Sequence, residues 1–341
     1  MKQLEKWHWI DGTIAATLGT MDIGVDLAAV RNAAAVLTDH LQPTPAWAAP
    51  ALDEVTGARV VLKHEEVQPT GAFKVRGGLN LLSGLGCDVV SASTGNHGQS
   101  LAFAARRFGA RCRIVLPEPA NPTKVRALRA WGAEVVLHGT CMEQAGAHAR
   151  ALAARDGARF VHPADEPALI AGVGTLYLEL LTASPDLEYL LVPVGGGSGA
   201  AAACLVAAAV APNCRVIGVQ ASSSPAAHDS WRSGSLVERP NRTTIEGLAI
   251  GAGYATTQAV LRGGLDDFVL VSDEQVRAAQ LLLLTHAHTL AEGAGAASLA
   301  GLLALRSRLA GRRVGVVVTG GNASPAELGT VLDATHHAEV A

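Results

Sequence analysis

The sequence predicts an α/β protein with two doubly wound domains and mostly parallel sheets. Short apolar runs alternate along the chain with longer stretches of helical periodicity. Many of the runs end in Gly, Ser, Thr or Asn just before a helical stretch, as parallel strands do at a ligand-binding edge. The 341 residues are 49% hydrophobic but only 4% aromatic, which suits tightly packed helices on buried strands, and they exceed what one small core needs.

The strands are expected where Val, Ile and Leu form short continuous runs, because strands buried on both faces carry such runs. In chain order these runs are 59–65, 88–93, 111–117, 133–139, 188–195, 214–220, 267–273 and 312–321. Helical periodicity lies between them, at 96–109, 122–131, 142–156, 168–182, 199–210, 274–291, 296–309 and 324–335. Residues 1–40 are expected to be peripheral, and the role of this segment is left unassigned.

Composition and charge exclude several classes of function. The net charge is −3, and no basic stripe stands out, so nucleic acid is not an expected partner. No apolar run reaches the roughly 18 residues of a membrane span. The five cysteines are odd in number and lack C-x-x-C spacing, which predicts free thiols in the cytoplasm and no zinc site.

The segment QPTGAFKVRGG (68–78) places Lys74 between Phe73 and a pair of glycines. The whole chain has only five lysines, so few of them are available for amine chemistry. A lysine in apolar surroundings has its pKa lowered by desolvation or forms a covalent bond. Lys74 is therefore the candidate catalytic amine.

A second motif, PVGGGSG (193–199), joins a predicted strand to an Ala-rich helix. Small residues let backbone N–H groups approach an anion, and the helix N-terminus favours negative charge, so the loop suits a phosphate. The spacing fits neither a P-loop nor a dinucleotide fingerprint. A glycine turn with only a packing role is the alternative. The candidate phosphate ligands are Gly195, Gly196, Gly197, Ser198 and Gly199.

Another strand-to-helix junction, STGNHGQS (93–100), carries Ser93, Thr94, Asn96 and His97. Hydroxyls, an amide and exposed N–H groups at a helix start suit a carboxylate, although an ordinary N-cap has the same pattern. Such a loop is a candidate site for the carboxylate of a substrate.

Two later segments complete the set of candidates. Thr319 in VVVTGGN (316–322) offers a hydroxyl to a neutral ring nitrogen, or simply ends a strand. Glu292 in EGAGA (292–296) faces the site, or caps a helix. Together with Lys74, a phosphate loop, a carboxylate loop and a hydroxyl for a ring nitrogen match the needs of pyridoxal 5'-phosphate and a small-molecule amino acid substrate.

With these motifs the sequence resembles the serine/threonine dehydratase family of fold type II (tryptophan synthase beta-like) pyridoxal-phosphate-dependent enzymes, from about Leu41 to Ser324. The resemblance implies that Lys74 forms the Schiff base, that Phe73 packs on the ring, and that Asn96 contacts the cofactor's 3'-oxygen. It also implies that Thr319 faces the pyridine nitrogen and that the cofactor lies in a cleft between two domains. PTP (43–45) and PADEPALIAGVGT (163–175) add to it.

The resemblance implies a dehydratase or ammonia-lyase, in which β-elimination on L-threonine or L-serine gives a 2-oxo acid and ammonia. Racemisation stays open, because Thr94 keeps a hydroxyl where the family's racemases act opposite the lysine. β-Replacement and a lyase for a specialised amino acid, of the ectoine or secondary-metabolite type, also stay open. Dehydratases usually carry serine at the position of Ala72, which leaves the substrate undecided.

The family also implies a discontinuous large domain (1–85 with 161–341), a small domain (86–160) and a homodimer. The acidic residues of the family's cation site are absent after the strand that ends in Gln220, so no metal is predicted.

Overall fold

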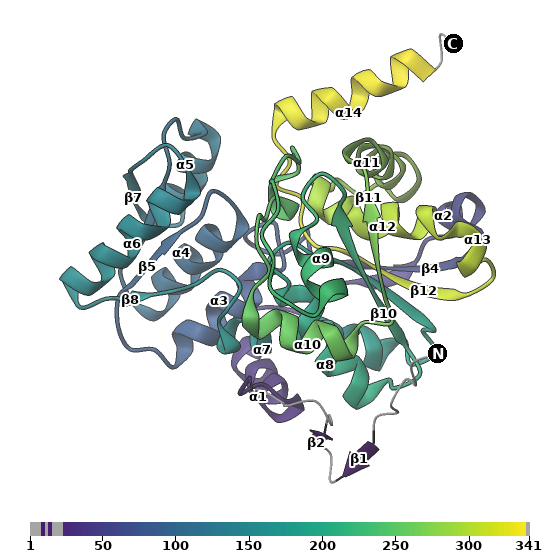
Figure 1. The fold of residues 1–341 in the computed structure, drawn as a ribbon, viewed down its shortest axis with the longest axis horizontal. Coiled ribbons are helices and arrows are strands. Elements are labelled where there is room, and N and C mark those ends of the chain that lie inside the picture. Colours follow the sequence, from purple (N-terminus) through teal and green to yellow (C-terminus); the bar gives the residue numbers. More distant parts are fainter. Residues whose placement is uncertain (1–7, 11–12, 16–22, 339–341) are drawn as a thin grey trace.

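The computed structural model describes residues 8–10, 13–15 and 23–338, and a six-stranded sheet forms its centre (Figure 1). The strand order is β11-β10-β9-β12-β4-β3. All neighbours are parallel except the edge strand β3, which pairs antiparallel to β4. The strands are β3 (Ala46–Ala48), β4 (Arg59–His64), β9 (Tyr189–Pro193), β10 (Arg215–Ala221), β11 (Asp267–Val271) and β12 (Arg313–Val318).

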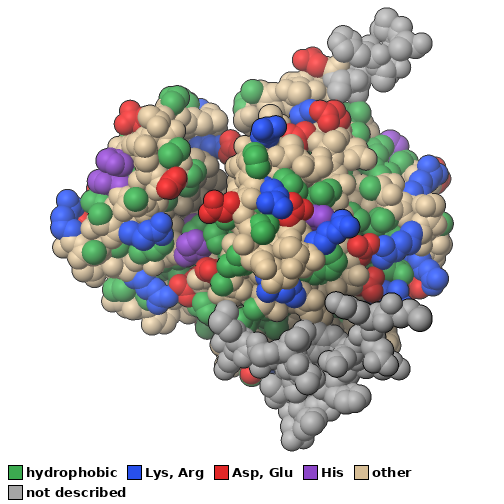
Figure 2. Space-filling view, viewed as in Figure 1, with side chains coloured by type: hydrophobic (Ala, Val, Ile, Leu, Met, Phe, Trp, Pro, Cys, Tyr) green, Lys and Arg blue, Asp and Glu red, His purple; other side chains and the backbone are tan. Residues whose placement is uncertain are grey.

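A second, four-stranded parallel sheet has the order β7-β6-β5-β8. With helices α4, α5 and α6 it forms the small lobe, on the left of Figure 1. Figure 2 shows a hollow between this lobe and the rest of the molecule. The strands are β5 (Val89–Ala92), β6 (Cys112–Leu116), β7 (Glu134–Leu137) and β8 (Arg159–Phe160).

Helices cover both sheets. Those of the small lobe are α4 (Asn96–Phe108), α5 (Pro122–Ala130) and α6 (Met142–Asp156). The others are α1 (Leu27–Thr38), α2 (Pro50–Thr56), α3 (Lys74–Ser83), α7 (Pro167–Ala183), α8 (Ser198–Val210), α9 (Ala226–Ser233), the 3-10 helix η1 (Glu246–Leu248), α10 (Ala255–Gly264), α11 (Asp273–Ala287), α12 (Gly293–Ala304), α13 (Arg306–Leu309) and α14 (Pro325–Ala338).

The six-stranded sheet is buried on both faces. In β4, Val61 joins a core formed with α1, α7 and α8, whereas Val60 and Leu62 join a second core with α2, α11 and α12. Successive side chains of a strand point to opposite faces, so a strand between two cores must be apolar throughout. This explains why the sequence shows continuous apolar runs at these strands.

Helix α3 joins the two sheets, because its glycines permit close helix packing. A Cβ at Gly77 would lie 2.9 Å from the carbonyl oxygen of Leu169 in α7, and one at Gly78 would collide with Ser100 Oγ in α4. Ser100 Oγ also donates a hydrogen bond of 2.6 Å to the carbonyl oxygen of Lys74. The first turn of α3 is therefore held between the small lobe and the central sheet.

The predicted fold class is confirmed. Each of the eight predicted strands and each predicted helical stretch corresponds to an observed element, with ends shifted by a few residues. Helix α11 ends at Ala287, four residues early, because His288 takes a left-handed conformation (φ 51°) and caps it. The sequence analysis missed β3, β8, α1, α2, α3, α9, η1 and α10, most of which are short.

The prediction that residues 1–40 are peripheral is wrong for α1, where Val30 and Ala33 are fully buried in the core formed with α7 and α8. Before residue 23 the structure describes only β1 (His8–Ile10) and β2 (Thr13–Ala15), which pair antiparallel. Within the described residues no helix is long and apolar enough to cross a membrane. Figure 2 shows acidic and basic side chains interspersed over this face, with no single-sign field. The exact division into a large and a small domain stays a prediction, since Val75 and Leu79 of α3 share a core with Leu101 and Ile114 of the small lobe.

Candidate active site

Lys74 is the first residue of α3, and its amine lies beside the glycine loop. Lys74 Nζ is 3.0 Å from Ser198 Oγ and 4.9 Å from the centroid of the Phe73 ring. Burial lowers the pKa of Lys74 to about 8, so an appreciable minority of the amine is neutral near physiological pH. A partly neutral amine beside an apolar ring can act as a base or a nucleophile.

The first three glycines of the loop, Gly195, Gly196 and Gly197, have no room for a side chain. A Cβ at Gly195 would collide with the carbonyl oxygen of Gly247, and one at Gly196 would lie 2.6 Å from Ala164 Cβ. Gly197 has φ 92°, which favours glycine. The loop is thus a tight backbone cradle at the N-terminus of α8, where the first N–H groups have no partner within the helix.

This cradle and the amine fit pyridoxal phosphate. The N–H groups at the start of α8 suit the phosphate. Lys74 Nζ lies 3.0 Å from Ser198 Oγ, so the amine is next to this phosphate site. The Phe73 ring, which would be 3.6 Å from a Cβ on Gly199, supplies an apolar wall between the loop and α3. Thr257 Oγ1 stabilises the loop by donating a hydrogen bond of 2.9 Å to the carbonyl oxygen of Gly196. The sequence analysis did not predict this contact.

In the loop at 93–97, the Ser93 hydroxyl oxygen points toward the backbone of the loop itself. Ser93 Oγ accepts hydrogen bonds of 3.2 Å from the backbone N–H groups of Gly95 and Gly98, so it stabilises the start of α4. Thr94 is only partly buried. Its side chain makes no polar contact within the described part of the chain, which leaves the hydroxyl free for a ligand.

His97 is buried behind this loop. Its Nε2 lies 3.1 Å from Ser91 Oγ, and Ser91 Oγ donates in turn to the carbonyl oxygen of Val161 at 2.7 Å. His97 Nε2 is therefore the donor to Ser91. Burial, aided by the charge of Lys74, lowers the pKa of His97 to about 3, so the ring is neutral. The side chain faces the protein, and the backbone N–H at the start of α4 is the part of His97 open to a carboxylate.

Asn96 and Glu292, 196 residues apart in the chain, meet directly. Asn96 Nδ2 donates to Glu292 Oε1 at 2.5 Å. Burial raises the pKa of Glu292 to about 7 despite this hydrogen bond. Asn96 Oδ1 accepts a second bond of 2.8 Å from Asn322 Nδ2, which the sequence analysis did not single out. Glu292 thus faces the site, one of the two alternatives left open for it.

Thr319 and Ala72 lie on adjoining backbone segments. The N–H of Phe73 donates 3.0 Å to the carbonyl oxygen of Thr319, and Ala72 forms a bridge with Gly320. Thr319 Oγ1 is buried and donates a long bond of 3.3 Å to the carbonyl oxygen of Ala294. The Thr319 hydroxyl is therefore held near the lysine segment. To donate to a ring nitrogen it would have to give up only its weak hydrogen bond to Ala294.

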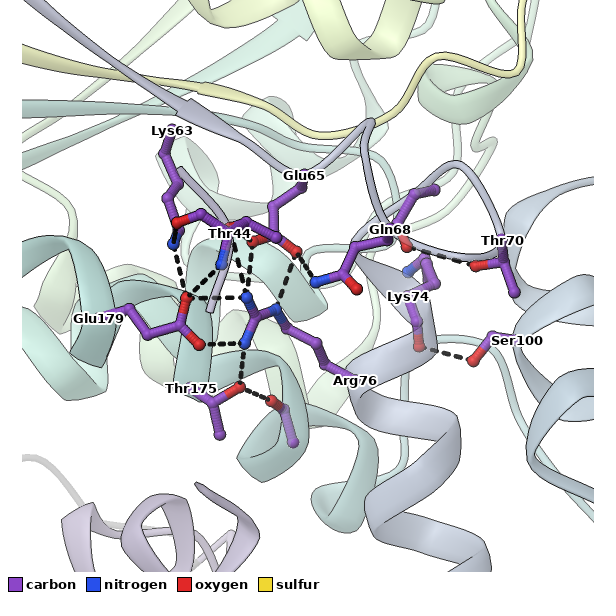
Figure 3. Close-up of polar contacts among 12 residues, drawn as sticks. Thr44, Lys63, Glu65, Gln68, Thr70, Lys74, Arg76, Ser100, Thr175 and Glu179 are labelled. Carbon is purple, nitrogen blue, oxygen red and sulfur yellow. Dashed lines mark hydrogen bonds and ion pairs between the residues drawn. The ribbon is translucent and has the colours of Figure 1, made fainter. Parts of the chain in front are cut away.

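A cluster of four charged side chains, three of them buried and Glu179 partly exposed, lies near the lysine (Figure 3). Arg76 donates to Glu65 through Nε and Nη2, each at 2.8 Å, and to Glu179 at 2.6 and 2.9 Å. Lys63 Nζ donates to Glu179 at 2.6 Å. Burial would lower the pKa of Arg76, but the two carboxylates outweigh it and hold that pKa above its ordinary value. This cluster ties α3, two residues after Lys74, to β4 and α7.

An ion pair also spans the hollow between the lobes. Lys124, at the start of α5 in the small lobe, contacts the carboxylate of Glu246 in η1. The next residue, Gly247, has its carbonyl oxygen against Gly195 of the cradle, as described above. The pair therefore connects the small lobe to the loop that covers the glycine cradle, and nothing in the local sequence indicated it.

Comparison with known proteins identifies the family of this chain. Residues 37–320 match the family described as pyridoxal-phosphate dependent enzyme. The chain is 39% identical over 287 residues to the L-threonine ammonia-lyase of Geobacter sulfurreducens, covering 82% of this chain and 71% of that protein.

Solved structures resemble the fold closely. The processed form of threonine deaminase isoform 2 from Solanum lycopersicum superposes with a TM-score of 0.85 at 28% identity, covering 90% of this chain and 87% of that one. Maize serine racemase gives a TM-score of 0.84 at 26% identity, covering 93% and 99%. The chain belongs to the pyridoxal-phosphate-dependent enzymes of fold type II, in the serine/threonine dehydratase family.

Proposed function

We propose that the protein is a pyridoxal-phosphate-dependent lyase that converts L-threonine or L-serine into a 2-oxo acid and ammonia. The observation that carries this proposal is the placement of the Lys74 amine, with its lowered pKa, 3.0 Å from Ser198 in the glycine cradle. The base and the proposed phosphate site are then in direct contact. The 39% identity to an L-threonine ammonia-lyase supports the same reaction.

Each residue of the site has a distinct role in this proposal. When bound, the cofactor supplies an electron-withdrawing ring that accepts the electron pair left at the substrate α-carbon. The N–H groups of Gly195 to Gly199 hold its phosphate, and Asn96 and Thr319 bind the ring's oxygen and nitrogen. Lys74 is the residue that would anchor the cofactor covalently, and its amine would become free when an amino acid takes its place. Phe73 packs on the ring, and Glu292 fixes Asn96.

The substrate is held by the 93–97 loop in this proposal. Its carboxylate accepts hydrogen bonds from the start of α4, including the backbone N–H of His97, and from the hydroxyl of Thr94. The freed Lys74 amine would remove the α-proton, and the β-hydroxyl would leave with the electron pair of its C–O bond and take up a proton. The α-hydrogen and the hydroxyl are thus lost together as one water. The resulting enamine takes up water to give the 2-oxo acid and ammonia.

The rate should rise with pH through the pKa of Lys74. The amine accepts a proton only when neutral, and burial lowers its pKa to about 8. We therefore expect kcat to rise by about tenfold per pH unit well below this pKa and to level off above it. The measurement is kcat at saturating L-threonine across this range, with stability checked at each pH. A profile that stays flat through this pKa would contradict the role of Lys74 as the base.

The variant Gly196→Ala should weaken cofactor binding by at least about tenfold, because the added Cβ displaces an N–H of the cradle. That Cβ would lie 2.6 Å from Ala164 Cβ. The control is Gly146→Ala in α6, where the new Cβ meets only the end of Arg150 at 3.8 Å. Titration of both apoproteins with pyridoxal phosphate measures the effect. Equal affinity in the two variants would show that the loop does not hold the phosphate.

The substrate is identified by relative kcat/KM. Holoenzyme would be assayed for 2-oxo acid with L-threonine, L-serine, D-threonine, D-serine and L-threo-3-hydroxyaspartate. We expect L-threonine or L-serine to be preferred over its D-form. A preference for a substrate outside this pair would redirect the proposal to a specialised lyase.

Racemisation is a second candidate, because the Thr94 hydroxyl has no polar partner among the described residues. A hydroxyl on the face of the substrate opposite a lysine can return the α-proton with inversion. Chiral chromatography of L-serine after incubation measures it. If Thr94 serves as the second acid, Thr94→Val should lower racemisation much more than elimination, which loses only one contact to the substrate carboxylate, so the ratio of racemisation to elimination should fall.

We propose further that the protein acts as a homodimer in the cytoplasm. The homodimer follows from the family resemblance, and the cytoplasm from the five cysteines without paired spacing. Sedimentation of the purified protein tests the first of these.

A further inference from the structure

Asn322 connects three segments of the active site. Its Nδ2 donates hydrogen bonds of 2.8 Å to the carbonyl oxygen of Thr70 and of 2.8 Å to Asn96 Oδ1. Its own Oδ1 is packed against Gly71, where a Cβ would lie 2.5 Å away, and Gly71 has φ 68°. Because both Nδ2 hydrogens are used in hydrogen bonds, only one orientation of the Asn322 amide satisfies them. Thr70 and Gly71, in the segment before Lys74, fix that orientation.

The Asn96 amide is oriented by two different partners. Its Oδ1 accepts from Asn322, and one of its N–H groups donates to Glu292 Oε1 at 2.5 Å. If the Asn96 amide turned over, its oxygen would face the carboxylate and its NH₂ would face another NH₂. Both neighbours therefore select the same orientation. Within the described residues, the second N–H of Asn96 has no partner and is available to a ligand.

We infer that Asn322 is a positioning residue, which holds the Asn96 amide with its free N–H ready to donate to the cofactor. This inference rests on the proposed function, in which Asn96 binds the ring oxygen. Asn322 is exposed, so its bond competes with water, and its effect on binding is moderate. Asn322 acts through Asn96 and does not touch the cofactor.

The variant Asn322→Asp tests the inference, because it keeps the shape and replaces the donor with an acceptor. We expect the affinity of the apoprotein for pyridoxal phosphate to fall by about three- to tenfold and the absorbance maximum of the bound cofactor to shift. The matched control is Asn32→Asp, the same change at an exposed position of α1. Thermal unfolding of each apoprotein reports folding, and Asn322→Ala replaces the aspartate variant if that one does not fold.

A double-mutant cycle with Asn96→Ala separates positioning from a general structural role. If Asn322 acts through Asn96, its substitution has no further effect on affinity or absorbance in the Asn96→Ala background. An undiminished effect in that background, or an Asn322 variant that behaves like Asn32→Asp, overturns the inference. If wild-type protein fails to bind the cofactor or to form a 2-oxo acid, the proposed function itself fails, which is a different outcome from an additive cycle.

Discussion

Replacing Lys74 with alanine is expected to lower kcat by at least about a thousandfold, because it removes both the covalent anchor and the base. Lys74 Nζ is beside Ser198 Oγ, whereas the other lysines in the described part of the chain, Lys63 and Lys124, pair with Glu179 and Glu246. Borohydride reduction followed by peptide mapping should find a pyridoxyl group on Lys74 in wild-type protein. The same treatment should find none in the variant.

The control for this variant is Lys74→Arg, which keeps the charge but forms no Schiff base. Both variants should still bind the cofactor without a covalent bond, because the cradle from Gly195 to Gly199 is unchanged. Fluorescence titration of the cofactor checks this. Turnover above about a tenth of wild type in either variant would place the base elsewhere.

Replacing Arg76 with methionine should lower the free energy of unfolding by about 3–5 kcal/mol. The substitution leaves Glu65, which is fully buried, without its partner, and removes one of two cations from Glu179. A buried carboxylate without a cation is strongly unfavourable, even though replacing the entire cluster with apolar residues could be neutral. Urea denaturation of the apoprotein measures the change.

The matched control is Arg312→Met, which removes an ion pair with Glu188 at 2.8 Å on the surface. Solvent screens that pair, so no measurable loss of stability is expected. A change in Arg76→Met as small as that of the control would mean that the cluster does not stabilise the fold. Since Arg76 is two residues after Lys74, partial unfolding of α3 should also reduce cofactor binding.

Much of the fold could be predicted because its signals are local. A strand buried on both faces must be apolar throughout, and β4, β9 and β12 carry that pattern in consecutive residues. The edge strand β3 has only three residues and its pattern is partly exposed, so the sequence contained little to identify it. Helix α3 was missed because its paired glycines are typical of a turn, whereas in the structure they allow contact with α4 and α7.

The main motifs were predicted because each is a continuous segment at the end of a strand. The structure brings Lys74 to Ser198 and Asn96 to Glu292. The roles of these residues stay predictions until they are tested. Contacts between distant residues left no local signal: Lys124 with Glu246, Asn322 with Asn96, and Lys63 with Glu179. Each depends on the three-dimensional arrangement of the lobes.

The most direct test of the account is the stoichiometry of the reaction. Holoenzyme would be incubated with L-threonine and, separately, with L-serine, and 2-oxo acid and ammonia would be measured in the same sample. The account predicts that both products appear in equal amounts and that Lys74→Ala forms neither. Cofactor-loaded protein that releases neither product from either amino acid would contradict β-elimination on these substrates.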